Sequence, residues 1–218
     1  MLNIVTVQVQ NYAGRGGEYL AKLYAGIARH VPEGTGCRGA CFTDDPSTLP
    51  EGVEGRQNAP GLTGWWNKLA MFKPDAFDPG ERVLYFDLDT IILGDLSGLA
   101  NYRGHFAALR DPFDGGILNS AIMAWEAGKF DHIWAHWESA GRPQFDPRGD
   151  QNWIGQMIGV TPDYWNDLLP GQLVSFKKDC WQRGAIPDDA RALFFHGRPR
   201  PHECQAQFVK DLWNRPAP

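Results

Sequence analysis

The residues of this chain that are best suited to metal or phosphate chemistry are two aspartates, Asp87 and Asp89, separated by Leu88. They follow the run Val83-Leu84-Tyr85-Phe86, which is typical of a central strand covered on both faces. Side chains two residues apart on extended backbone point to the same side, so both carboxylates are ionised at low cost only with a cation between them. We therefore expect Mn²⁺ or Mg²⁺ bound by Asp87 and Asp89, with open positions for substrate phosphates. The alternative is that one aspartate only caps a turn.

The surrounding segments predict an α/β fold that holds this pair at a sheet edge. Alternating or continuous apolar residues predict strands at 2–9, 38–43, 83–86, 105–110, 117–124 and 191–195. Helical spacing predicts helices at 18–30, 65–72, 126–140 and 150–158, and residues 45–64 read as a long loop. Strand, helix and strand in this order form a right-handed crossover, so we expect a mostly parallel central sheet flanked by helices. In such sheets, ligands bind beyond the carboxyl ends of strands, where the aspartates are expected.

Length and charge restrict the class of protein. The 218 residues suit one domain, which we assign to 1–213, followed by a frayed tail at 214–218. The net charge of −5 argues against nucleic acid as a partner. The chain shows neither a signal-peptide pattern nor an apolar run of the ~20 residues that a transmembrane segment needs, so we expect a cytoplasmic protein.

Four segments together resemble the GT-A-fold glycosyltransferases, whose domain is Rossmann-like, and especially the family 8-like group related to glycogenin and lipopolysaccharide galactosyltransferases. They are NKLAMFKP at 67–74, RVLYFDLDTIILGDL at 82–96, ILNSAIMAW at 117–125 and GDQNWI at 149–154. The resemblance extends from about Ile4 to about His202 and makes the aspartate pair the DxD motif of that family. It implies metal-dependent sugar transfer from a nucleotide-sugar donor, most simply a UDP-sugar, to an unknown acceptor, with retention of the anomeric configuration.

The same resemblance implies roles for individual residues. Val9, Asn11 and Tyr12 would hold the nucleotide base, Lys68 would face the donor, and Asp87 would contact ribose or metal while Asp89 binds the metal. It places Arg110, Asp111 and Asn119 towards the donor sugar, and Asp150 and Gln151 on the side where the reaction takes place. Simple structural roles remain open, because Asp150 is also a suitable helix N-cap and the Asn119 amide could tie two loops together.

The C-terminal segment FFHGRPRPH, 194–202, departs from the family pattern. Aligning Gly197 and Arg200 with that pattern puts Phe194 where a metal-binding histidine usually stands. His196 lies one pleat repeat further on, so we expect it to be the third metal ligand, or else to hydrogen-bond the diphosphate. Gly197, Arg198 and Arg200 would border the donor, with the Arg200 guanidinium offsetting the diphosphate charge.

Two other functions fit parts of the pattern. A haloacid-dehalogenase-like phosphatase also places aspartates two residues apart after an apolar strand, and Asp188-Asp189 could supply its late acidic pair. That family normally has Gly and then Thr after its second aspartate, whereas Thr90 follows Asp89 directly here. A non-catalytic protein that binds nucleotide sugars or a partner is the second alternative.

Overall fold

The computed structural model describes residues 1–144 and 149–215 as a mixed α/β fold around a seven-stranded sheet. The strand order is β3-β2-β1-β4-β7-β6-β8. β1 pairs in parallel with β2 and β4, β2 with β3, and β6 with β8, whereas β7 lies antiparallel between β4 and β6. The strands are β1 (Leu2–Gln8), β2 (Cys37–Thr43), β3 (Val53–Gln57), β4 (Arg82–Phe86), β6 (Phe106–Arg110), β7 (Leu118–Glu126) and β8 (Asp163–Tyr164).

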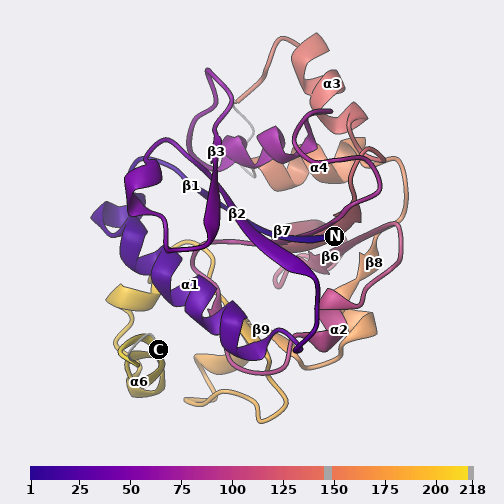
Figure 1. Cartoon of the computed structure of the whole chain (residues 1–218). Coiled ribbons are helices and arrows are strands. Elements are labelled where there is room, and N and C mark those ends of the chain that lie inside the picture. Colours follow the sequence, from indigo (N-terminus) through magenta and orange to yellow (C-terminus); the bar gives the residue numbers. More distant parts are fainter. Residues whose placement is uncertain (145–148, 216–218) are drawn as a thin grey trace.

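Helices cover both faces of this sheet (Figure 1). On one face lie the 3₁₀ helix Gly64–Phe72 and helices α3 (His132–Ser139) and α4 (Asp150–Met157); on the other lies α1 (Gly16–His30). Helices α2 (Ser97–Ala100) and α5 (Trp165–Leu168) are short. Both faces of β4 are apolar because both are covered. Val83 and Tyr85 pack on the side of α3, whereas Leu84 and Phe86 pack on the side of α1.

A smaller sheet, in the order β5-β10-β9, lies beside the main one. It consists of β5 (Ile91–Ile92), β9 (Leu173–Ser175) and β10 (Ala192–Phe194), and is followed by α6 (Gln207–Trp213). Figure 1 shows α6 next to α1, and Lys22 of α1 donates a hydrogen bond to the carbonyl of Trp213. β5 begins two residues after Asp89, so the small sheet is attached directly to the aspartate pair.

Most predicted elements are confirmed within one or two residues, including the crossover from β1 through α1 to β2. Two predictions were wrong. The loop at 45–64 contains β3, an edge strand whose sequence Val-Glu-Gly-Arg-Gln carries almost no apolar signal because most of it faces solvent. The helix at 126–140 begins only at His132, since β7 continues to Glu126.

The end of the chain was predicted to be frayed from residue 214. The backbone N–H groups of Asn214 and Arg215 still donate to the carbonyls of Lys210 and Leu212, at 2.9 and 3.3 Å. Residues 216–218 lie outside the described part of the chain. Among the described helices, none has the length and apolar character that crossing a membrane requires.

Replacing Trp125 on β7 tests the packing on the α3 side of the sheet. Its side chain is 2% exposed and stacks on Phe72, with ring centroids 4.8 Å apart. Trp125→Ala should lower the free energy of unfolding by about 3–5 kcal/mol, because it removes a large buried ring and leaves a cavity. Trp181→Ala is the matched control, since Trp181 is 56% exposed, and we expect a loss below about 1 kcal/mol. Urea denaturation measures both values, and equal losses would contradict this account of the core.

Candidate functional site

A cavity of about 850 Å³ opens at the carboxyl ends of β1 and β4. Its volume lies in the range of pockets that enclose small organic ligands, about 300–1,000 Å³. It is lined by side chains from segments far apart in the sequence, which include Val9, Tyr12, Lys68, Asp87, Asp89, Asn119, Asp150, Gln151, His196, Gly197, Arg198 and Arg200. Twelve of the fifteen residues predicted for the site therefore surround one space, and the three that do not line it are Asn11, Arg110 and Asp111.

The floor of the cavity is an ion-pair network around Lys68. The Nζ of Lys68 lies 2.8 Å from Oδ1 of Asp87 and 3.4 Å from Oδ2 of Asp150, and it donates to Ser120 Oγ at 3.0 Å. Ser120 in turn donates to Asp150 at 2.7 Å. Burial alone would lower the pKa of Lys68, but the charges of Asp150 and Asp87 outweigh it and raise the pKa above its usual value. Lys68 is therefore a permanent cation that holds two carboxylates in place.

Asp150 is the most enclosed acid of the network, with 4% of the residue exposed. Its burial raises the pKa of the carboxyl, although Lys68 and the hydroxyl of Ser120 act in the opposite direction. Asp150 is the first residue of α4, whose N-cap residue is Gly149. The simple capping role considered for Asp150 is thus replaced by an ion pair that ties α4 to β7 and to the 3₁₀ helix.

Asp87 and Asp89 form the end of β4 and both face the cavity. Asp87 accepts a hydrogen bond from Tyr85 at 2.6 Å, and Asp89 accepts one from Tyr12 at 2.7 Å. Asp89 is 8% exposed, and burial together with the charge of Asp87 raises its pKa well above the usual value for an aspartate. A buried carboxylate beside a second, half-buried one suits a hard divalent cation, which prefers oxygen ligands and would offset the cost of ionising Asp89. The residues present fit such an ion.

His196 is not brought into a ligand cluster with the two aspartates. Its Nε2 lies 2.9 Å from Ser175 Oγ, and its ring meets Phe113 edge-on at 5.4 Å. Burial and the charge of Lys177 lower its pKa, so the imidazole is neutral at neutral pH. Within residues 1–144 and 149–215, no group of three or more His, Cys, Asp or Glu side chains is arranged to hold a metal. The histidine lines the cavity as a neutral hydrogen-bonding group.

One wall of the cavity carries amides next to the acids. Asn119 Nδ2 donates to Gln151 Oε1 at 3.4 Å, and Gln151 Nε2 donates to Asp111 Oδ2 at 3.5 Å. Asn119 also accepts from the backbone N–H of Ala121, so its amide orientation is fixed. Asp111 thus reaches this wall only through Gln151.

Arg110 is not among the residues that line the cavity. It forms an ion pair with Asp167, and its guanidinium carbon lies 3.9 Å from the ring centre of Tyr164. The donor-binding role predicted for Arg110 has no support in this arrangement, because its charge is already neutralised elsewhere.

Basic and aromatic side chains also line the cavity. The guanidinium carbon of Arg200 lies 4.5 Å from the ring centre of Tyr12, and Arg198 forms an ion pair with Glu203. Asn11 stands in a left-handed conformation, with φ of 47°, and its side chain accepts from the N–H of Gly16 at 2.9 Å. Asn11 therefore shapes the loop before α1 and leaves Tyr12 to face the cavity.

Trp65, Tyr85 and Ser120 are among the lining residues that were not predicted. Tyr85 precedes Asp87 by one pleat repeat, so the period of the strand could have identified it. Ser120 is next to Asn119, and neighbours on a regular strand point to opposite faces. The pairing of β6 and β7 shifts register between Ala107 and Leu109, opposite this segment, and the sequence carries no clear signal of that irregularity.

The acidic pair that a phosphatase would need does not join the site. Asp188 and Asp189 are exposed and are not among the residues that line the cavity with Asp87 and Asp89. This removes the observation that favoured the phosphatase alternative.

Comparison with known proteins finds no matching family model and no matching curated sequence. Solved structures do match. The glycosyltransferase GlyE of Streptococcus pneumoniae TIGR4, in its apo form, superposes with a TM-score of 0.71 at 15% identity over 97% of this chain, which spans 59% of the GlyE chain. The galactosyltransferase LgtC, in complex with donor and acceptor sugar analogues, gives a TM-score of 0.67 at 14% identity and covers 96% of this chain and 93% of its own.

A third match is the bifunctional glycosyltransferase WbbM, with a TM-score of 0.67, 12% identity and coverage of 97% of this chain and 48% of WbbM. At these identities the likeness concerns the fold. The chain therefore has the α/β architecture of these glycosyltransferase structures, with its cavity at the carboxyl ends of β1 and β4.

Proposed function

We propose that this chain is a metal-dependent glycosyltransferase that takes a sugar from a nucleoside-diphosphate sugar, most simply a UDP-sugar. The observation that carries the proposal is the convergence of Asp87, Asp89 and Lys68 with Arg198 and Arg200 on one cavity. Acids that fit a cation face basic groups across a space of nucleotide-sugar size, as a charged diphosphate donor requires. The shared fold with glycosyltransferase structures supports the same reading.

In this proposal Asp87 and Asp89 hold Mn²⁺ or Mg²⁺. When bound, the cation would supply positive charge to the donor diphosphate, whose negative charge grows as the sugar leaves. Arg200 would add a charge-assisted contact, held in place by its stacking on Tyr12. Tyr12 also donates to Asp89, so the base-binding end and the acidic end of the cavity are mechanically connected.

Lys68 has a positioning role here. Its single positive charge pairs with both Asp87 and Asp150, so the positions of these two carboxylates are fixed before the donor binds. Asn119 and Gln151 would face the donor sugar and orient it by hydrogen bonds through amide groups that are already linked to each other. In the transfer, the anomeric carbon–oxygen bond to the diphosphate breaks, a bond to an acceptor hydroxyl oxygen forms, and the hydroxyl proton passes to the leaving phosphate. Retention is proposed from the family resemblance, and we assign no protein nucleophile.

Replacing Asp89 tests the role of the acidic pair. Asp89→Asn keeps the size of the side chain but removes one anionic ligand, so metal-dependent hydrolysis of a UDP-sugar should fall by about 100-fold or more. Asp188→Asn is the matched control, because Asp188 is exposed and lies outside the cavity lining. The measurement is UDP release with Mn²⁺, together with circular dichroism to confirm the fold. Wild-type activity in a folded Asp89→Asn variant would rule out the proposed metal role.

Ligand-induced stabilisation tests donor binding without knowledge of the acceptor. A nucleoside diphosphate present at ~100 times its Kd should add ~2.7 kcal/mol to the free energy of unfolding, or roughly 5–10 °C in the unfolding midpoint. We expect the shift with Mn²⁺ and a much smaller one with EDTA, measured by thermal denaturation across a panel of nucleoside diphosphates and nucleotide sugars.

The Asp89→Asn variant serves as the control in that panel, since it should lose the Mn²⁺-dependent part of the shift. Absence of any shift with every ligand would contradict the proposed donor. Stabilisation without hydrolysis or transfer would instead favour the non-catalytic binding protein.

A further inference from the structure

An exposed tryptophan lies at the mouth of the large cavity that holds the proposed donor site. Trp65 is 58% exposed and belongs to the lining of this cavity. Other large apolar side chains of similar exposure among the described residues, such as Phe113 and Trp181, are not part of the lining. The neighbouring Trp66 is 4% exposed and packs in the core on the α3 side. The chain therefore places one of two adjacent tryptophans in the core and leaves the other open, where a bound ligand would bury its ring.

The 3₁₀ helix determines the depth at which this ring lies. Three residues complete one turn of such a helix, so side chains at i and i+3 lie on the same face. Trp65 and Lys68 are related in this way within Gly64–Phe72. Lys68 is 7% exposed on the floor of the cavity, whereas Trp65 is one turn nearer to solvent. The indole therefore lies on the cavity face of the helix, outside the ion pairs that Lys68 forms with Asp87 and Asp150.

A glycine determines the side of the cavity on which the indole lies. Gly149, the N-cap residue of α4, has a φ of 64°, which favours glycine. A Cβ at this position would overlap the edge of the Trp65 ring that carries Nε1, so only glycine permits this contact. The next two residues of the chain, Asp150 and Gln151, both line the cavity. Trp65 is therefore fixed against the start of α4, on the side that carries these polar groups.

The chemistry of this side of the cavity is that of a flat apolar ring bordered by polar groups. Lining residues from β7 and α4 are Asn119, Ser120, Ala121, Asp150 and Gln151. Such a surface is not continuous enough in apolar area for a lipid chain. It is complementary to a pyranose ring, which has C–H groups on its faces and hydroxyl groups around its edge.

The nucleotide end of the cavity has an aromatic ring of its own. Tyr12 donates to Asp89 at 2.7 Å, and the guanidinium carbon of Arg200 lies 4.5 Å from its ring centre. Trp65 instead contacts the start of α4. The two rings thus belong to different segments and are available for different substrates.

We propose that the acceptor of the transfer is a sugar that stacks one face on Trp65 and directs its hydroxyl edge towards Gln151. The inference rests on the proposed function, because it concerns the second substrate of the same cavity. One hydroxyl oxygen of the stacked sugar forms the bond to the anomeric carbon of the donor, the bond from that carbon to the diphosphate breaks, and the hydroxyl proton passes to the leaving phosphate. Trp65 takes no part in these bonds and serves to hold the acceptor in place.

Transfer to methyl glycosides tests this inference. The full chain, with Mn²⁺ and a UDP-sugar that it hydrolyses, is incubated with the methyl glycosides of glucose, galactose, mannose and N-acetylglucosamine. Disaccharide product is measured by mass spectrometry together with UDP release. We expect saturable product formation with at least one of these glycosides.

Replacement of Trp65 then separates acceptor binding from donor binding. Trp65→Leu keeps an apolar side chain beside Gly149 but removes the flat ring, so KM for that glycoside should rise about tenfold. The Kd of UDP, measured by calorimetric titration, should change by less than about twofold, whereas a general disturbance of the site would weaken both ligands. Trp65→Phe restores a flat ring and should recover most of the loss. Trp181→Leu is the matched control, since Trp181 is 56% exposed and lies outside the cavity lining, and it should leave KM unchanged.

The outcomes distinguish failure of this inference from failure of the proposed function. UDP release without product from any glycoside would overturn the sugar acceptor and leave the proposed function intact, and so would glycosylation of a serine-containing peptide alone. An unchanged KM in Trp65→Leu would also overturn the inference. A parallel loss of UDP affinity would do the same, because it would assign the ring to the nucleobase. Absence of UDP release from every donor would contradict the proposed function, and this inference with it.

Discussion

The contact on which the site depends is the buried ammonium group of Lys68 between Asp87 and Asp150. It joins the 3₁₀ helix Gly64–Phe72, the end of β4 and the start of α4. These three segments also pack together through the apolar side chains of Leu69, Tyr85 and Ile154. Isolated charges are costly to bury, and removal of one partner from such a group leaves an uncompensated charge. The network therefore favours one arrangement of the three segments, in which Asn119 and Gln151 face the same space as the acids. Ser120 completes the network by bonding to both Lys68 and Asp150.

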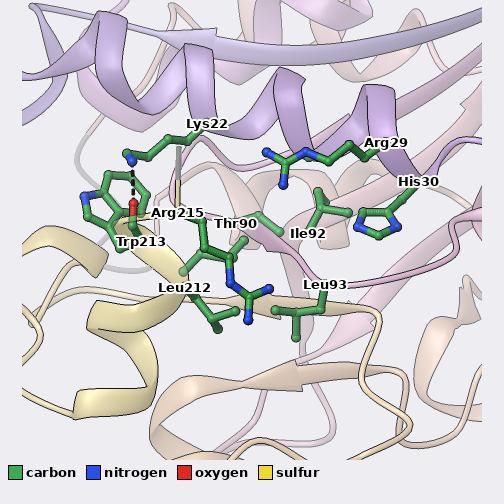
Figure 2. A pocket seen from close by; sticks show the side chains of 11 residues that line it. Lys22, Arg29, His30, Thr90, Ile92, Leu93, Leu212, Trp213 and Arg215 are labelled. Carbon is green, nitrogen blue, oxygen red and sulfur yellow. Dashed lines mark hydrogen bonds between the residues drawn. The ribbon is translucent and has the colours of Figure 1, made fainter. Parts of the chain in front are cut away.

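The turn that follows β4 has two chemically different sides. Asp87 and Asp89 face the large cavity, where Tyr12 donates to Asp89 and the guanidinium of Arg200 lies over the Tyr12 ring. The next residue, Thr90, lies against a small pocket behind the turn, which Lys22, Arg29 and Arg215 also line (Figure 2). The large cavity itself holds both signs of charge, because Lys68, Arg198 and Arg200 line it together with the acids. A net charge of −5 for the whole chain does not reveal this local grouping, because opposite charges cancel in the sum.

Sequence patterns were most informative where the hydrophobic signal was strong. The continuous apolar run Val83–Phe86 predicted a strand buried on both faces, and β4 lies between β1 and β7 with both faces covered. β3 was missed because an edge strand needs only backbone hydrogen bonds to β2 and presents few apolar side chains. The short elements β5, β8 and β9 were also missed, since two or three residues cannot establish a period of two.

The sequence alone determines the types of the site residues and their order along the chain. The aspartate pair after an apolar strand, Lys68 before it, and Asn119, Asp150 and Gln151 after it were sufficient to place most of the site, because strand ends in an α/β sheet meet at one edge. Only the tertiary structure decided which side chains form ion pairs and hydrogen bonds with one another. It paired Asp150 with Lys68, His196 with Ser175 and Arg110 with Asp167. It also brought Arg29 and Arg215, more than 180 residues apart in the chain, to the lining of one small pocket. The reason is physical: composition and spacing define which groups a segment offers, whereas pairing between distant charges depends on how the segments pack in three dimensions.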